Sequence, residues 1–390
     1  MNAALMLEEG RLLRQQDRAS AIDYYSKQMQ KAAVCHDREL WLASTLTLAW
    51  ELLESGKSDG GLIAQTLSVA DPNDPYLRLA QARLRMSQGD FAAAIDVLTP
   101  EVSTIDDLEL QGLLVDALAQ CYAITHQFDK AKPLFDRAIT LLSPASFYLG
   151  FSYLHRGEMY LFAQDFDQGE EAAQTAIEIA LQTEDHLLRF YGLVLLVKIE
   201  LQRQELEVAS NLITDCQELI DPAIDLLESV VLALLQIEVF CQMGDAKSAT
   251  SLWEYIAPLV GQLQDWRTQQ QASYIKARVG IAQINAGLIG LHEDTVEEIE
   301  DILLNVAIEY EQRQMYSCQA LVLLNAAGLY TIAAKLPTPY QFRGKSLRAL
   351  EQAGVLLEKV GLKNTQLGRA VEELYDRILD NLSVTDNHQH

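Results

Sequence analysis

The chain has 390 residues, of which 49% are hydrophobic and 22% charged, a composition typical of a folded protein rather than a disordered or membrane-embedded one. Its 55 acidic and 30 basic residues give a formal net charge of −25, which argues against a nucleic-acid groove and against docking on an anionic membrane. Five scattered cysteines without a C-x-x-C pair favour reduced thiols, and no signal peptide is visible, so we expect a cytoplasmic protein.

Residues 1–74 are predicted to form degenerate helical hairpins. Ala21 and Tyr25 stand four residues apart, an offset that places both on one face of a helix. A GKS sequence beginning at Gly56 resembles the end of a phosphate-binding loop. That loop requires a glycine five residues before its Gly-Lys pair, where this chain has Glu51, so we predict a turn between two helices instead.

From residue 75 to 262 the chain repeats a short pattern, a turn followed five positions later by a small residue. The copies are 89–94 (GDFAAA), 126–131 (HQFDKA), 164–169 (QDFDQG), 204–209 (QELEVA) and 244–249 (GDAKSA). Together with the turn at 56, the predicted turn positions are 56, 89, 126, 164, 204 and 244, at intervals of 33 to 40 residues.

Small and aromatic residues recur at fixed places in these copies. The small ones let two helix backbones approach closely, and a larger side chain there would overpack the crossing. They are Ala82, Ala119 and Gly157 in the first helices and Ala94, Ala131 and Gly169 in the second. The aromatic residues fill the wedge between neighbouring hairpins, and they are Phe91, Phe128 and Phe166.

This pattern resembles tetratricopeptide (TPR) repeats, whose period is about 34 residues, with slightly lengthened helices or loops. The resemblance implies an all-α fold, an α-solenoid of antiparallel helix–turn–helix repeats. The repeat length predicts about nine hairpins and a cap. No stretch alternates apolar and polar residues, so no strand is expected. Pro258 lies inside a predicted second helix and is expected to kink it.

The pattern becomes irregular over residues 263–363, where further helical hairpins are predicted, with a loop at 337–344. The segment 315–334 is uncharged, but its polar side chains would be costly facing lipid, so we predict a helix buried between neighbours. Residues 364–382 have one apolar and one charged face and suit a C-terminal capping helix. The tail, 383–390, is predicted to be disordered.

Motifs for catalysis or metal binding are not evident. A calcium loop starting at Asp165 would need glycine at its sixth position and a carboxylate at its twelfth, where this chain has Glu170 and Ala176. The histidines lack metal-ligand spacing, and neither a nucleophile elbow nor a Cys/His pair is present. We therefore expect no enzyme, no cofactor and no metal. The acidic run at 297–301 is interpreted as a solvated face, with a docking patch for a basic partner as the alternative.

In the TPR family, the first helices of successive hairpins line a concave groove in which ligands usually lie. Carried over to this sequence, that register places aromatic rings and charges of both signs in the groove, a mixture that suits an extended peptide. The predicted partner-binding residues are Trp50, Tyr76, Arg83, Asp116, Gln120, Glu158, Phe162, Tyr191, Lys198 and Glu238. The rings of Trp50, Phe162 and Tyr191 could equally pack between hairpins.

The resemblance implies a non-catalytic scaffold or adaptor that binds a protein or peptide in its concave groove, with basic partners favoured by the acidic charge. The alternative is a ligand or peptide-signal sensor of a bacterial regulatory system. TPR-like arrays serve as peptide-pheromone receptors in Gram-positive bacteria and as the inducer-binding arm of maltotriose-type regulators. Neither a helix-turn-helix signature nor a DNA-binding domain is visible here, so we expect such a sensor to act through protein contacts.

Overall fold

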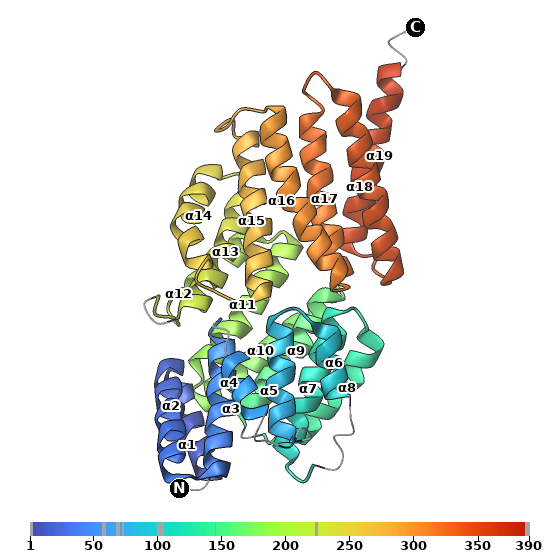
Figure 1. Ribbon diagram of the computed structural model, residues 1–390. Helices are drawn as coiled ribbons and strands as arrows, with labels where there is room; N and C mark the ends of the chain where they lie inside the picture. Colours follow the sequence, from blue (N-terminus) through green and yellow to red (C-terminus); the bar gives the residue numbers. More distant parts are fainter. Residues whose placement is uncertain are drawn as a thin grey trace. The chain divides into compact units, whose positions relative to one another are not determined.

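Every regular element of the described residues is an α-helix, as the sequence predicts, and consecutive helices form antiparallel pairs in the computed structural model (Figure 1). The structure describes residues 3–56, 60–67, 71, 74–99, 105–144, 146–222 and 225–386. The earlier helices are α1 (Ala3–Gln16), α2 (Arg18–Cys35), α3 (Arg38–Glu54), α4 (Gly60–Leu67), α5 (Pro75–Ser87), α6 (Phe91–Leu98), α7 (Leu108–Ile124), α8 (Phe128–Leu141), α9 (Phe147–Phe162) and α10 (Phe166–Thr183). The later helices are α11 (His186–Arg203), α12 (Leu206–Gln217), α13 (Leu226–Met243), α14 (Ala246–Val260), α15 (Trp266–Asn285), α16 (Glu293–Gln312), α17 (Tyr316–Ala333), α18 (Pro339–Lys359) and α19 (Gln366–Asp386).

Aspartate side chains begin many of these helices. Each accepts a hydrogen bond from a backbone N–H two or three residues later, which satisfies a donor that the helix itself leaves without a partner. The capping residues are Asp17, Asp37, Asp74, Asp90, Asp107, Asp165 and Asp185. The abundant acidic residues therefore help to set the helix boundaries.

The six turn positions predicted from the repeat all have a left-handed backbone conformation. Their φ angles lie between 59° and 78°, at Gly56, Gly89, His126, Gln164, Gln204 and Gly244. A left-handed residue just after the last helical residue is a common way to end a helix and turn the chain. The predicted turn register is therefore confirmed at all six positions, although residues 57–59 of the GKS turn lie outside the described residues.

Small residues lie at the helix crossings, as predicted. Ala82, Ala94, Ala119 and Ala131 are completely buried. Gly157 of α9 lies against α10 and α11: a Cβ added to it would stand 2.6 Å from Leu195 Cδ2 and 3.3 Å from the Gly169 carbonyl oxygen. The crossing therefore has no room for an additional methyl group unless the Leu195 side chain moves.

The variant Gly157→Ala is expected to lower the free energy of unfolding by roughly 1–3 kcal/mol, because the buried Leu195 side chain has little room to move. Chemical denaturation measures the change. In the control Gly328→Ala, on α17, the new Cβ meets no described atom within 4 Å, and helix propensity should raise stability by up to about 1 kcal/mol. Equal stability gains in both variants would contradict the close approach at Gly157.

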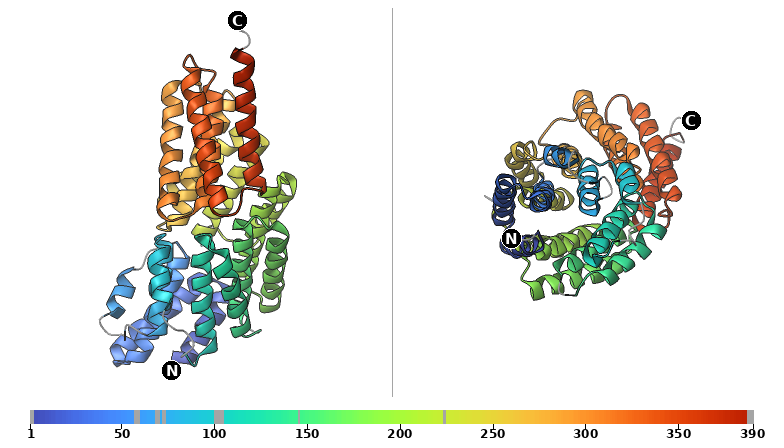
Figure 2. Two further views of the ribbon diagram at one scale, coloured as in Figure 1. Left: turned by 90° about the vertical axis from the view of Figure 1, so that its right-hand side faces the viewer. Right: turned by 60° about the horizontal axis from the view of Figure 1, so that its bottom comes forward.

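The chain divides into two compact units, and unit 1 comprises Met1–Leu161, Asp165–Leu235 and Pro258–Gln269. Its core consists of small apolar clusters between neighbouring helices. Phe135, for example, is fully buried among alanines of α7 and α8. The helices of unit 1 follow a curve in the right-hand view of Figure 2, and α1 contacts α11.

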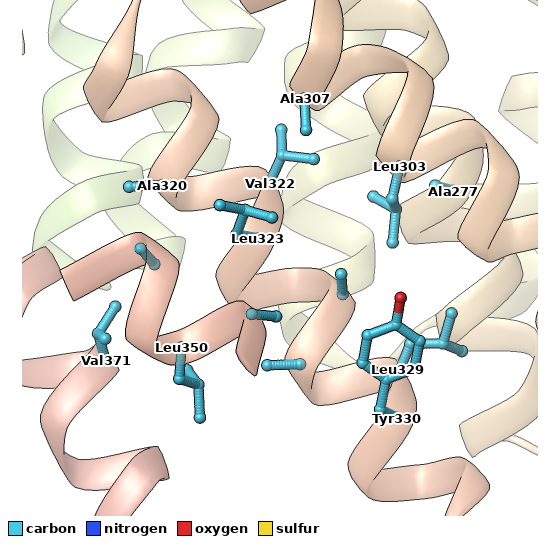
Figure 3. Packing of buried hydrophobic residues seen from close by; sticks show 14 of the residues in the cluster. Ala277, Leu303, Ala307, Ala320, Val322, Leu323, Leu329, Tyr330, Leu350 and Val371 are labelled. Carbon is cyan, nitrogen blue, oxygen red and sulfur yellow. The ribbon is translucent and has the colours of Figure 1, made fainter. Parts of the chain in front are cut away.

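Unit 2 comprises Phe162–Gln164, Gln236–Ala257 and Gln270–His390. One large apolar cluster connects its helices α15 to α19, and Figure 3 shows part of it, including Leu303 and Tyr330. This cluster explains why the last third remains compact although its repeat pattern is weak.

One acidic residue of the 297–301 run is buried, contrary to the predicted solvated face. Glu300 is 8% exposed, and it accepts hydrogen bonds from Tyr330 Oη at 2.9 Å and from Lys345 Nζ at 2.8 Å. Glu297, Glu298 and Asp301 are exposed, as predicted. Most of the run therefore faces solvent, while Glu300 joins α16 to α17 and α18.

Two helix boundaries differ from the prediction, and Pro258 lies near the end of its helix. α18 begins at Pro339, which shortens the loop predicted at 337–344, because proline fits the first helical position, where no N–H partner is lost. α19 continues to Asp386, into the predicted tail, and residues 387–390 lie outside the described part of the chain. Pro258 lies in the last turn of α14, two residues before its end at Val260.

Two of the described helices, α13 and α17, are long and apolar enough to cross a membrane by length and composition alone. Core helices of folded proteins pass the same test, so this is weak evidence for a membrane span. α17 packs between α16 and α18, and none of its residues from Tyr316 to Tyr330 is exposed. The structure thus agrees with a helix buried between neighbours.

Candidate functional site

The first helices of the hairpins in unit 1 lie side by side and form what we call the first-helix layer: α3, α5, α7, α9, α11 and the part of α13 that belongs to unit 1. α3 contacts α5, and α5 contacts α7. Eight of the ten predicted partner-binding residues are on this layer, and they are Trp50, Tyr76, Arg83, Asp116, Gln120, Glu158, Tyr191 and Lys198.

Buried ion pairs connect the first two helices to this layer. Arg18 Nη1 of α2 lies 2.9 Å from Glu228 Oε1 of α13, and Arg14 Nε of α1 lies 3.0 Å from Glu51 Oε1 of α3. The four side chains are only 3–8% exposed. Tyr191 Oη also donates a hydrogen bond to Glu228 Oε1 at 2.8 Å. Residues 210 positions apart in the sequence are thereby held together inside unit 1.

Aromatic rings meet across the layer. The Trp50 ring of α3 stacks on the Tyr148 ring of α9, with centroids 5.6 Å apart and an interplanar angle of 20°. The guanidinium groups of Arg83 and Arg14 lie over the rings of Trp50 and Phe151, at 5.2 and 5.3 Å. Trp50 therefore contacts both Arg83 of the neighbouring hairpin and Tyr148 of α9, three hairpins further along the chain.

A polar cluster joins α7 to α9. Asp116 Oδ2 lies 2.9 Å from His155 Nδ1 and accepts a hydrogen bond from Gln120 Nε2 at 2.7 Å. Burial alone would raise the pKa of Asp116, but His155 and the nearby Arg83 outweigh it and hold that pKa below its ordinary value. Asp116 is 2% exposed and carries a negative charge that the cluster stabilises.

A second charged group joins α9 to α11. Lys198 Nζ lies 3.4 Å from Glu158 Oε1. Burial alone would raise the pKa of Glu158, but Lys198 and Arg267 lower it to about 2. Glu158 is still 23% exposed, so water screens part of this attraction.

The depressed pKa of Glu158 predicts a pH-dependent contribution to stability. A carboxyl whose folded pKa is about 2 and whose ordinary value is 4.5 stabilises the fold fully above pH 4.5 and progressively less as the pH falls toward 2. The difference in free energy of unfolding between the wild type and Glu158→Gln is therefore expected to shrink from about pH 5 to about pH 3. Urea titrations at several pH values measure it, and a constant difference would contradict the prediction.

The other predicted residues stand apart from these groups. Tyr76 is 40% exposed at the start of α5, where its Oη lies 3.4 Å from the capping carboxylate of Asp107. Phe162 and Glu238 belong to unit 2. A role in partner binding stays a prediction for all ten residues.

Sequence reasoning missed the partners that come from other repeats or from the N-terminal helices. They are Arg14, Arg18, Glu51, Tyr148, Phe151, His155, Glu228 and Arg267. Two of them could have been predicted from the repeat spacing, because His155 follows Asp116 by 39 positions and Glu228 follows Tyr191 by 37.

No family model matches this sequence, and comparison with curated proteins finds no match. Among solved structures, the chain is similar to a Rap protein complexed with competence and sporulation factor, with 12% identity over 91% of this chain and 99% of that one and a TM-score of 0.66. Yeast Tom70 (13% identity, 95% and 99% coverage, TM-score 0.32) and the TPR domain of P58(IPK) (14%, 97% and 98%, 0.26) match with TM-scores too low to support an argument. At these identities the likeness shows the fold alone. The chain is a TPR-like helical repeat protein.

Proposed function

We propose that this protein is a non-catalytic receptor for a peptide signal, acting in the cytoplasm through contacts with another protein. The observation that carries the proposal is the likeness, across almost the full length of both chains, to a Rap protein bound to a signalling peptide. This likeness favours a sensor over a plain adaptor. The scattered cysteines, none of which forms a C-x-x-C pair, support the cytoplasmic location.

The first-helix layer supplies the chemistry that an extended peptide needs. It offers aromatic rings as anchors and polar groups that can pair with a main chain. The charged side chains described above, in the layer and in the parts of α1, α2 and α15 that lie against it, comprise five cations and four anions, so by themselves they favour no basic peptide despite the acidic chain. The cations are Arg14, Arg18, Arg83, Lys198 and Arg267, and the anions are Glu51, Asp116, Glu158 and Glu228.

The ion pairs of Arg14 and Arg18 can couple peptide binding on the layer to the arrangement of α1 and α2. They hold α1 and α2 against the layer, so a peptide that binds the layer more tightly in one arrangement of these helices shifts the population toward that arrangement. A partner protein that recognises the surface of α1 and α2 would then read the ligand state.

A soluble library of random hexapeptides tests the proposal. At least one pool should raise the Tm of the wild-type protein, because a ligand that binds only the folded state stabilises it. The affinity of resolved hits, measured by calorimetry, should fall about tenfold in Lys198→Met, the cost of one lost charged contact. The control Lys247→Met, at an exposed position of α14, should bind like the wild type. If no pool raises the Tm and none gives a calorimetric signal, the proposal fails.

Small-angle scattering separates the sensor from the adaptor. A sensor should change its radius of gyration at a saturating concentration of the best hexapeptide, since its response requires a change of conformation. An unchanged radius of gyration together with tight binding would favour the adaptor.

A further inference from the structure

The outer face of α16, which lies entirely in unit 2, carries an exposed apolar pair. Leu304 and Ile308 are 37% and 48% exposed, and side chains four positions apart are neighbours on a helix surface. The inner face of the helix packs separately, since Val296, Leu303 and Val306 belong to the large apolar cluster of unit 2. The pair therefore forms one contiguous apolar spot that faces solvent.

Acidic side chains surround this spot. α16 has eight acidic residues among its 20 and neither lysine nor arginine. Lys345 pairs with Glu300, and Arg313 pairs with Glu309. Five further acidic residues are exposed and form neither an ion pair nor a side-chain hydrogen bond with any residue that the structure describes: Asp294, Glu297, Glu298, Asp301 and Glu311. The negative charge of this face is thus not compensated by neighbouring side chains.

The exposed residues follow the spacing with which helices pack along one another. Glu297, Asp301, Leu304, Ile308 and Glu311 are separated by four, three, four and three positions, as in the seam between two helices. From residue 297 to residue 311 this stripe extends about 21 Å, at 1.5 Å per residue. It has an apolar centre between acidic ends, which is the arrangement of a protein interface with an apolar core and a polar rim.

The charge of the stripe decides which partner fits it. If two copies of α16 packed antiparallel, Glu297 of one copy would meet Glu311 of the other, and a parallel pair would align each acidic residue with itself. Nucleic acid and an anionic membrane would be repelled in the same way. A helix that carries lysine or arginine on both sides of an apolar pair complements the stripe in charge and in apolar surface.

We propose that the outer face of α16 docks a basic amphipathic helix of a partner protein. Leu304 and Ile308 pack against the apolar residues of that helix, and the acidic ends pair with its cations. The inference goes beyond the peptide receptor, because this surface requires neither the first-helix layer nor a bound signal peptide. It assigns to the acidic run at 297–301 a partner of basic charge.

A designed peptide of about 20 residues tests the surface, with two central leucines four positions apart, lysines on both sides of them along the same face, and alanine elsewhere. Fluorescence anisotropy should show that it binds the full chain. Binding should weaken severalfold when the salt concentration rises from about 0.1 M to about 1 M, because the Debye length falls from about 10 Å to about 3 Å. A second peptide with glutamate in place of lysine should not bind.

The double variant Leu304→Gln/Ile308→Gln should bind the basic peptide about tenfold more weakly, since it removes the apolar centre. Its net charge is that of the wild type, and both positions are exposed, so the fold should be retained, as circular dichroism can check. The control Leu181→Gln makes the same kind of change at a position of α10 that is 59% exposed, and it should bind like the wild type.

Three outcomes would overturn the docking surface. The first is that the wild type does not bind the basic peptide, and the second is that the glutamate peptide binds equally well. The third is that Leu304→Gln/Ile308→Gln binds as tightly as the wild type, which would leave only a general attraction between a basic peptide and an acidic chain. The peptide receptor is tested separately, by the hexapeptide library, and can stand or fall without this surface.

Discussion

The variant Arg18→Met is expected to lower the free energy of unfolding of unit 1 by about 3–5 kcal/mol, the usual cost of breaking a buried ion pair. Without Arg18, the carboxylate of Glu228, which is 3% exposed in the wild type, would lose its ion-pair partner and keep the Tyr191 hydroxyl as a hydrogen-bond donor. The same loss should release α2 from α13, since this contact spans 210 residues of sequence.

Urea denaturation measures the loss, and hydrogen exchange of α2 reports the release. The double variant Arg18→Met/Glu228→Gln should recover much of the stability, because no uncompensated charge remains. Lys27→Met is the control on the same helix: its partner Asp23 is exposed, and a surface pair contributes roughly 0–1 kcal/mol. A small effect of Arg18→Met, similar to that of Lys27→Met, would show that the buried pair does not hold unit 1 together.

The second large effect is expected at Phe135. This residue of α8 is fully buried in a cluster with Ala119 of α7, Ala131 of α8 and Met159 of α9. Phe135→Ala should lower the free energy of unfolding by about 3–5 kcal/mol, since it removes a buried ring and leaves a cavity. Tyr255→Ala, at a position 70% exposed, should change it by less than about 0.5 kcal/mol. If denaturation gave equal values for the two, the packing of this repeat would be wrong.

The repeat was predictable from sequence because every hairpin needs the same kinds of residue at its turn and at its helix crossing. Positions 56, 89, 126, 164, 204 and 244 recur because each hairpin ends its first helix with a left-handed residue. The small residues recur because each pair of backbones approaches closely. Contacts within one helix, such as Gln120 with Asp116, follow from the same register. The left-handed Gln314 between α16 and α17 escaped prediction, since no turn motif surrounds it.

The rest of the candidate site depends on how the hairpins curve, and local sequence does not encode that curve. Pairs one repeat apart, such as Glu158 with Lys198, could be predicted by aligning successive repeats with one another. The stacking of Trp50 on Tyr148 and the pairing of Arg18 with Glu228 are not, because they join helices several hairpins apart. The intervals between turns, which range from 33 to 40 residues, do not indicate which distant helices meet.

Hydrogen–deuterium exchange with and without the best hexapeptide tests the proposed receptor most directly. Bound peptide should slow exchange in α9 and α11, which carry Glu158, Tyr191 and Lys198, and leave α8, α10 and α12 unchanged. Protection confined to those second helices, with α9 and α11 unaffected, would contradict a peptide receptor that uses its first-helix layer.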